Sequence, residues 1–380
     1  MPTVESVTAA LATVNDPELH KPVTELGMVG EIAISDHGAV DVTILLTTTG
    51  CPLKDRLLAD VTGAVSPVDG VTGVSVTFGV MDDDQKETLR TKLRGGRPQR
   101  EISFAQPSSL TRVYAIASGK GGVGKSSVTV NLAVAMAAEG LQVGIVDADV
   151  YGHSVPRLLG NHERATQAAG MILPPEAHGV RFLSMEMFKP DPKTPVSWRG
   201  PMLHRALEQF LADAYWGDLD VLLLDLPPGT GDVAISLGQL VPSAEIVVVT
   251  TPQLAAREVA ERAGLIAVQM RQRVVGVIEN MAYLLCAHCG EKTEIFGSGG
   301  GAAVSEGLTQ ALGYDVPLMA SIPFETALRA GGDEGLPLVV SAPESPAAVE
   351  LMKVAKQLTA RGRGLAGRSL SLSPVTSKGA

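Results

Sequence analysis

The chain has 380 residues, of which 45% are hydrophobic and 19% charged, values typical of a globular protein with two or three domains. Its formal net charge of −10 argues against a broad nucleic-acid-binding face. No apolar run approaches the roughly 18–20 residues that span a bilayer, the N-terminus lacks a secretory signal, and three cysteines are too few for a disulfide framework. We therefore expect a cytoplasmic protein with no nucleic-acid or membrane partner.

Residues 1–90 are predicted to form a small separate α/β domain. An amphipathic helix pattern opens the chain, and two strands with alternating apolar residues are expected at residues 29–34 and 40–46. A second helix is expected over residues 53–65 and a last strand over residues 71–80.

Residues 91–111 are predicted to be a linker, because their first part is basic, contains Gly and Pro and shows no apolar periodicity. Residues 112–360 alternate apolar, β-branched runs with helical patterns, which predicts a P-loop NTPase domain with a parallel sheet and helices on both faces. The apolar runs lie at residues 113–117, 143–146, 221–224, 246–249 and 274–278. The tail, residues 361–380, is rich in Ser, Gly and Arg and is predicted to be disordered.

The most informative motif is a glycine-rich run that fits Gly-x4-Gly-Lys-Ser between a predicted strand and a predicted helix. In such a loop the backbone N–H groups point at phosphate oxygens, which the N-terminus of the following helix also attracts. Lys125 can reach the β- and γ-phosphates, and the hydroxyl of Ser126 can bind Mg²⁺. The sequence therefore predicts a nucleoside triphosphate site. Its expected residues are Gly119, Lys120, Gly121, Gly122, Val123, Gly124, Lys125, Ser126 and Ser127.

Acidic residues follow two of the predicted strands, at the sheet edge where a parallel sheet binds its ligands. Asp225 comes after four apolar residues, a pattern typical of a carboxylate that holds Mg²⁺ through water. Asp149 is the better candidate for orienting the attacking water. The sequence leaves open whether Asp147 takes that role instead or is structural.

Cys286 and Cys289 form a Cys-x-x-Cys pair, whose thiolates can bind one zinc ion or one iron–sulfur cluster, or act as a redox dithiol. Zinc and iron–sulfur sites usually need four ligands, and His288 is poorly placed to share the metal. Two chains related by a two-fold axis would supply four thiolates, so the pair favours a metal site shared by a homodimer. The remaining cysteine, Cys51, is either a thiol of lowered pKa at a helix start or a small buried apolar residue.

Residues 112–360 resemble the Mrp/ApbC family of P-loop iron–sulfur cluster carrier ATPases. The matching motifs lie at residues 119–126, 147–156, 198–202, 225–232, 279–281, 286–289 and 295–301. Lys120 makes the loop similar to the deviant Walker A motif of nitrogenase iron protein, MinD and ParA. Residues 1–90 resemble the PaaD-like domain of iron–sulfur assembly factors. Two departures, His153 and Ala287 at positions where proline is common, preserve the spacing of the ligands.

The resemblance implies a homodimeric ATPase that carries iron–sulfur clusters from an assembly scaffold to apo-proteins, with ATP binding and hydrolysis controlling loading or release. Cys286 and Cys289 would bind a [4Fe–4S] cluster that bridges the two subunits, and Asn280 would contact the adenine base. Lys120 would cross to the nucleotide of the partner subunit and add a positive charge there. The expected catalytic residues are then Lys120, Lys125, Asp149 and Asp225.

A positional switch ATPase of the ParA or MinD kind is the main alternative. MinD-like chains carry a C-terminal amphipathic membrane helix, which the glycines and proline of residues 361–380 oppose. ParA-like chains need a basic DNA-binding face, which the net charge of −10 does not favour. Neither explains the cysteine pair, and a metabolic P-loop kinase would need an acceptor site that the sequence does not reveal.

Overall fold

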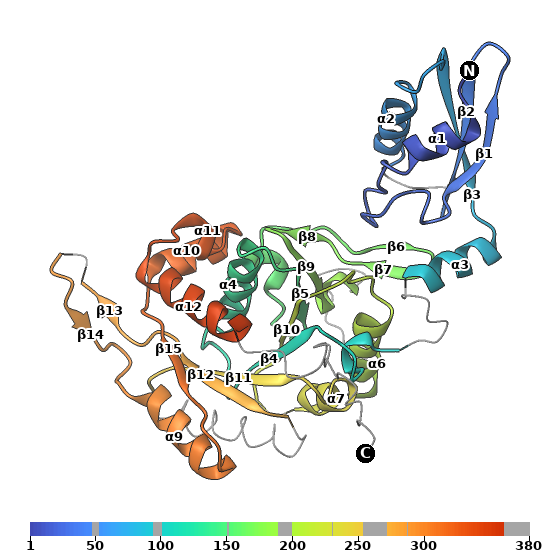
Figure 1. Ribbon diagram of the computed structural model, residues 1–380. Helices are drawn as coiled ribbons and strands as arrows, with labels where there is room; N and C mark the ends of the chain where they lie inside the picture. The colour runs from blue at the N-terminus through green and yellow to red at the C-terminus, as the bar shows by residue number, and fades with distance from the viewer. Residues whose placement is uncertain are drawn as a thin grey trace, which may run out of the picture. The chain divides into compact units, whose positions relative to one another are not determined.

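The computed structural model describes residues 1–47, 53–93, 101–149, 152–188, 200–229, 231–253, 272–286 and 288–360 (Figure 1). The chain divides into two compact units: unit 1 comprises residues 1–100, 165–174 and 213–217, and unit 2 comprises the remainder. In this described part of the chain, no helix combines the length and the apolar character needed to span a membrane. Predictions made for Cys51, Ala287 and the tail fall outside the described residues.

Unit 1 is built around a three-stranded sheet with the order β1–β2–β3. Its elements are α1 (Val4–Leu11), β1 (Val29–Ile34), β2 (Ala39–Leu46), α2 (Lys54–Val65), β3 (Gly73–Val80) and α3 (Asp83–Leu93). The central strand, β2, pairs antiparallel with β1 and parallel with β3, and its alternate residues Val40, Val42 and Ile44 are buried. α3 continues into the range expected to be a linker, because Leu89 and Leu93 lie one helical turn apart and are both buried.

Two segments from much further along the chain complete unit 1. β6 (Thr166–Ala168) and β7 (Met171–Leu173) form an antiparallel hairpin, whose apolar side chains are buried in the same cluster as those of β2. Nε of Arg90 in α3 donates a 2.7 Å hydrogen bond to the carbonyl of Ala169 in the turn of this hairpin. Residues 213–217 pair with β7 through the backbone of Ile172. The small unit is therefore a composite of the N-terminal residues and two later segments.

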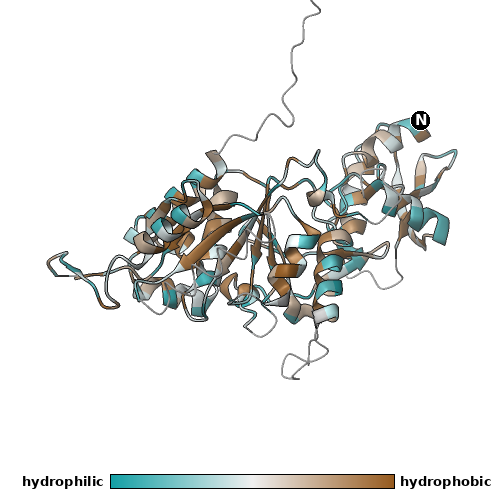
Figure 2. Cartoon of the chain, turned by 90° about the horizontal axis from the view of Figure 1, so that it is seen from below, coloured by the Kyte–Doolittle hydropathy of each residue, from teal (hydrophilic) through white to brown (hydrophobic). Residues whose placement is uncertain are grey.

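Unit 2 contains an eight-stranded sheet with the order β15–β12–β11–β4–β10–β5–β9–β8, in which neighbouring strands are parallel except at the edge strand β8. The strands are β4 (Arg112–Ser118), β5 (Val143–Asp147), β8 (Glu176–Ala177), β9 (Val180–Ser184), β10 (Val221–Asp225), β11 (Glu245–Thr250), β12 (Val274–Glu279) and β15 (Leu318–Ser321). β5, β10 and β12 are buried along their whole length, as a parallel sheet covered on both faces requires. Figure 2 shows the hydrophobic residues concentrated on these strands, and the predicted fold class is confirmed.

Helices flank this sheet on both sides. They are α4 (Lys125–Ala138), α5 (Val155–Leu158), α6 (Gly200–Ala212), α7 (Asp232–Leu240), α9 (Gly300–Leu312), α10 (Thr326–Glu334), α11 (Leu338–Ser341) and α12 (Pro346–Ala360). α4 packs against α11 and α12, so that most of its residues are buried, and Figure 1 shows α7 and α9 on the opposite side of the sheet. The carboxyl ends of the parallel strands meet along one edge, where ligands bind in such folds.

We expect the β6–β7 hairpin to contribute to the stability of unit 1. Met171→Ala truncates a side chain that is 3% exposed, and it should destabilise unit 1 by about 2–5 kcal/mol, the usual cost at a buried methionine. Gln167→Ala, at an exposed position of the same hairpin, is the matched control. Hydrogen exchange of the β2 amides measures the effect. Unchanged protection of β2 in the Met171 variant would contradict a shared core.

Candidate functional site

The glycine-rich loop joins the end of β4 to the start of α4. Gly122 and Gly124 both have a φ of +79°, a left-handed conformation that residues with a Cβ disfavour. Gly124 is the N-cap of α4, and a Cβ there would overlap with the side-chain amide of Asn280. The loop presents the unpaired N–H groups of the first turn of α4 at the carboxyl edge of the sheet, where they can bind an anion.

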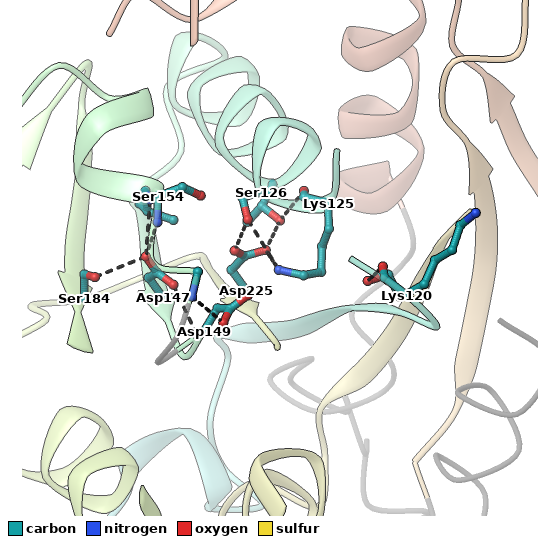
Figure 3. Close-up of polar contacts among 12 residues, drawn as sticks. Lys120, Lys125, Ser126, Asp147, Asp149, Ser154, Ser184 and Asp225 are labelled. Atoms are coloured by element: carbon teal, nitrogen blue, oxygen red, sulfur yellow. Dashed lines mark hydrogen bonds and ion pairs between the residues drawn. The ribbon is translucent and has the colours of Figure 1, made fainter. Parts of the chain in front are cut away.

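Asp225, at the end of β10, organises the centre of the site (Figure 3). Its carboxylate is fully buried and forms an ion pair with Nζ of Lys125 at 2.8 Å. The hydroxyl of Ser126 donates to Oδ2 at 2.5 Å, and the hydroxyl of Thr129 donates to Oδ1 at 2.9 Å. The structure therefore brings together Lys125, Ser126 and Asp225. Thr129 was not predicted from the sequence, although its position one helical turn after Lys125 puts it on the same face of α4.

Asp147 lies beside Asp225, because the two residues are register partners on the neighbouring strands β5 and β10. The pKa of Asp147 is raised to about 7, mainly by its burial and secondly by the negative charge of Asp225. Its Oδ2 accepts hydrogen bonds from the backbone N–H groups of Ser154 and Val155, at 3.1 and 3.2 Å. The same oxygen accepts a 3.1 Å hydrogen bond from the hydroxyl of Ser184 at the end of β9. These contacts support a structural role for Asp147 in fixing the loop after β5.

Asp149 lies within this loop and is 8% exposed. Its backbone N–H donates a 3.2 Å hydrogen bond to Oδ1 of Asp147, and its own Oδ1 accepts one of 2.9 Å from the N–H of Gly152. A Cβ at Gly152 would lie 3.0 Å from Oδ2 of Asp149, so the turn accommodates glycine best. Asp147 and Gly152 together set the position of the Asp149 carboxylate.

Lys120 does not join the Asp225 cluster. Figure 3 shows its side chain directed away from Lys125 and Ser126, and its Nζ donates a 2.5 Å hydrogen bond to Oε1 of Gln253. Gln253 lies three residues beyond the end of β11. A cation in this position faces away from the phosphate-binding turn of its own chain.

Asn280 follows β12 and is 2% exposed. Its Nδ2 donates a 2.9 Å hydrogen bond to the carbonyl of Val123 in the P-loop. Among the residues that the structure describes, Oδ1 of Asn280 and Oγ1 of Thr251, next to the end of β11, are buried without a hydrogen-bond partner. Unpaired buried polar atoms are costly, so both atoms suit a ligand that completes their hydrogen bonds. Nothing in the sequence pattern singles out Thr251.

Cys286 and Cys289 lie in the turn between two short paired strands, β13 (Leu284–Leu285) and β14 (Lys292–Thr293). Cys286 is partly exposed and Cys289 is exposed. Backbone hydrogen bonds from Cys289 and then from His288 lower the pKa of the Cys286 thiol below its ordinary value. Over the described ranges, no three His, Cys, Asp or Glu side chains gather closely enough to hold a metal ion. One chain therefore offers two accessible sulfur ligands at this turn.

Comparison with known proteins identifies relatives over nearly the whole chain. The family model described as NUBPL iron-transfer P-loop NTPase matches residues 109–359, and the model described as iron-sulfur cluster assembly protein matches residues 5–77. An iron-sulfur cluster carrier protein of Mycobacterium bovis is 58% identical over 370 residues, which are 97% of this chain and 97% of that protein. A protein of the same name from Synechocystis is 42% identical over 367 residues, which cover 95% of this chain and 98% of that protein.

A solved structure shares the fold of unit 2. The nucleotide-binding protein of Archaeoglobus fulgidus, in complex with ADP, is 33% identical, with a TM-score of 0.54. The match covers 65% of this chain and 93% of that chain.

The raised pKa of Asp147 predicts that the stability of the nucleotide-free protein depends on pH. In the unfolded chain this carboxyl ionises near its ordinary pKa of 3.8, whereas in the folded protein it keeps its proton up to about pH 7. The folded state therefore binds more protons between these values. Asp147 therefore contributes its full share to the free energy of unfolding below pH 3.8, and this contribution is lost as the pH rises to about 7.

Asp147→Asn removes this titration while keeping the size of the side chain. As the pH rises from about 5 to about 8, the free energy of unfolding of the wild type should fall relative to that of the variant. Urea unfolding of both proteins at several pH values measures the difference. The charged groups that face Asp147, Lys125 and Asp225, are present in both proteins. Their own contributions to the pH dependence of unfolding therefore largely cancel when the two proteins are compared. A difference that does not change with pH would contradict the raised pKa.

Proposed function

The chain belongs to the family of iron-transfer P-loop NTPases, and we propose that it is a homodimeric ATPase that carries iron–sulfur clusters to apo-proteins. ATP binding and hydrolysis control the loading or release of the cluster. Unit 2 holds both a P-loop whose Lys125 is ion paired with Asp225 and an exposed turn with two cysteines. This combination is the observation that carries the proposal. A positional switch would use the P-loop but leaves the cysteine pair without a role.

The residues at the P-loop fit a magnesium nucleotide. Asp225 and Asp147 are neighbouring buried carboxyl groups, and Lys125 is the cation that pairs with Asp225. The Ser126 hydroxyl and water molecules held by Asp225 are oxygen ligands of the kind that Mg²⁺ prefers, and a bound Mg²⁺ would offset the negative charge of Asp147 once it is deprotonated. The N–H groups of the loop and of the first turn of α4 would bind the phosphates, with Lys125 contacting the β- and γ-phosphates.

Asn280 fits the adenine base. The unpaired Oδ1 of Asn280 can accept a hydrogen bond from the exocyclic amino group of adenine. Guanine presents a carbonyl acceptor at the equivalent position, which would leave Oδ1 unpaired. The site therefore favours ATP over GTP.

Hydrolysis requires positioning and electrostatic stabilisation rather than covalent chemistry by the protein. Asp149 orients the attacking water, because its carboxylate is held in the loop beside Asp147. Lys120, which points away from its own Lys125, reaches the nucleotide of the partner subunit and stabilises charge on the transferred phosphoryl group.

The iron–sulfur cluster is the cargo. Two thiolates from each subunit, related by a two-fold axis, complete the four sulfur ligands of a [4Fe–4S] cluster. The lowered pKa of Cys286 favours the thiolate form that binds iron. Cluster assembly scaffolds and apo iron–sulfur proteins are then the partners that supply and receive the cluster.

A bridging cluster predicts that iron belongs to the dimer. After anaerobic reconstitution with iron and sulfide, the wild type should carry about four irons per dimer, eluting with the dimer in size-exclusion chromatography. Cys286→Ala and Cys289→Ala each leave two thiolates in place of four, so both variants should fold and bind ATP but lose the cluster. Cys51→Ala is the matched control and should retain it. Iron that elutes with a monomer, or a full cluster in Cys286→Ala, would contradict the bridging site.

The role of Asp149 is tested by Asp149→Asn, which keeps the acceptor for the N–H of Gly152 but removes the charge. ATP affinity measured by calorimetry should stay close to that of the wild type. Single-turnover hydrolysis should slow by about 100-fold or more, as expected when a group that positions and polarises the attacking water is lost. If this variant hydrolyses ATP normally, the role belongs to another carboxylate.

A further inference from the structure

The cysteine hairpin, defined here as residues 282–286 and 288–299, begins and ends beside the nucleotide site. Figure 1 shows its strands β13 and β14 projecting from the sheet between β12 and α9. The chain leaves the sheet through Asn280 and Met281, directly after β12, and returns at Gly300 and Gly301, the first residues of α9. The two ends of the hairpin therefore meet at the carboxyl end of β12.

Glu279, the last residue of β12, holds the returning end. Its side chain is 5% exposed, and its Oε1 accepts a 2.7 Å hydrogen bond from the backbone N–H of Gly301. Its Oε2 accepts a 3.1 Å hydrogen bond from the hydroxyl of Ser321 on the neighbouring strand β15. The unpaired N–H groups and the dipole of α9 stabilise a carboxylate at this position. Glu279 therefore ties the start of α9 to the sheet.

The start of α9 lies so close to the sheet that its first two residues leave no room for a side chain. A Cβ at Gly301 would lie 2.6 Å from Cβ of Glu279, and a Cβ at Gly300 would lie 2.6 Å from the carbonyl oxygen of Pro252. Both glycines are needed for this approach, which gives the glycine-rich run after the cysteines a physical reason. Because Glu279 is also hydrogen bonded to Gly301, a shift of Glu279 would move the start of α9 with it.

Asn280 joins the departing end of the hairpin to the P-loop. Its Nδ2 donates to the carbonyl of Val123 at 2.9 Å, and it packs against Gly124 so closely that a Cβ there would overlap with it. Met281 follows with a φ of +56°, which is uncommon for a residue with a side chain, and it turns the chain out of the sheet. The P-loop, Asn280 and the base of the hairpin are thus in consecutive contact.

We propose that Glu279 and Asn280 couple the P-loop to the cysteine hairpin, so that nucleotide bound at the P-loop changes the exposure and metal affinity of Cys286 and Cys289. Asn280 responds to the nucleotide because its side chain touches the loop that binds the phosphates. Glu279, which lies outside both the P-loop and the cysteine hairpin, is a positioning residue that passes the change to α9. The inference rests on the proposed function for the identities of the nucleotide and the cluster.

Cluster-free protein tests the link through the reactivity of its two thiols. Alkylation rates of Cys286 and Cys289, resolved by peptide mass spectrometry, are measured without nucleotide and with Mg²⁺ and a non-hydrolysable ATP analogue. We expect the nucleotide to change the wild-type rates by about five-fold or more, the lower range of coupling between sites. Glu279→Ala removes both acceptors, and Gly301→Ala inserts a Cβ against Glu279. Both should reduce the change to less than about two-fold, while calorimetry should show a nucleotide affinity within about five-fold of the wild type, since coupling is reciprocal.

Two further variants separate coupling from a general loss of structure. Glu279→Gln keeps an acceptor for the N–H of Gly301 and should retain most of the nucleotide response. Glu306→Ala removes an exposed carboxylate of α9 that accepts from Gln310, and it should behave as the wild type does. The proposal is overturned if nucleotide does not change the alkylation rates of the wild type. It is also overturned if Glu279→Ala and Gly301→Ala both show the full change, or if both lose nucleotide binding.

The same proteins, reconstituted with iron and sulfide, distinguish this inference from the proposed function. The rate at which an iron chelator removes the cluster should depend on nucleotide in the wild type and Glu306→Ala, but not in Glu279→Ala. A wild-type protein that retains no cluster would refute the proposed function. The alkylation result, obtained without a cluster, would still decide whether Glu279 links the two sites.

Discussion

The burial of Asp225 at the end of a central strand is the constraint on which the nucleotide site depends. A buried carboxylate is unfavourable unless it is paired and hydrogen bonded, and Lys125, Ser126 and Thr129 together satisfy it. All three belong to the first five residues of α4, so the contacts that stabilise the carboxylate also fix the P-loop against β10. Loss of either charge would leave the other buried without its partner. The fold and the phosphate-binding loop are therefore stabilised by the same interactions.

Asp147 limits the negative charge beside Asp225. Burial, and then the neighbouring charge of Asp225, raises the pKa of Asp147 to about 7, so the pair avoids carrying two full negative charges. A divalent cation at the site would favour loss of that proton. Because Asp147 also holds the loop that contains Asp149, its charge state and the position of Asp149 are linked through one side chain.

The apolar runs in the sequence were sufficient to predict the parallel sheet, and residues that follow such strands share one sheet edge, so Asp225 could be placed there with Lys125 and Ser126 of the P-loop. A strand, a short loop and a helix joined by few residues have few possible arrangements, so a motif of fixed spacing determines their geometry. The structural partner of Asp147 could not be predicted in this way. Ser184 lies on β9, a strand that was not predicted from the sequence. The β6–β7 hairpin was missed for the same reason, since its apolar residues are few and their burial depends on a core formed much earlier in the chain.

The contacts that the sequence could not reveal are also those that connect one functional segment to another. Val123 and Asn280 are 157 residues apart in the chain, and Glu279 and Gly301 lie on either side of the cysteine hairpin, yet each pair is joined by one hydrogen bond at the end of β12. Motifs therefore specify the chemistry available at each site, whereas contacts of this kind specify which segments touch one another. β12 lies between β11 and β15, and its side chains are buried along their whole length. Close-packed interiors transmit a displacement rather than absorb it. A link placed on this strand can therefore carry a small change at the P-loop to the base of the cysteine hairpin.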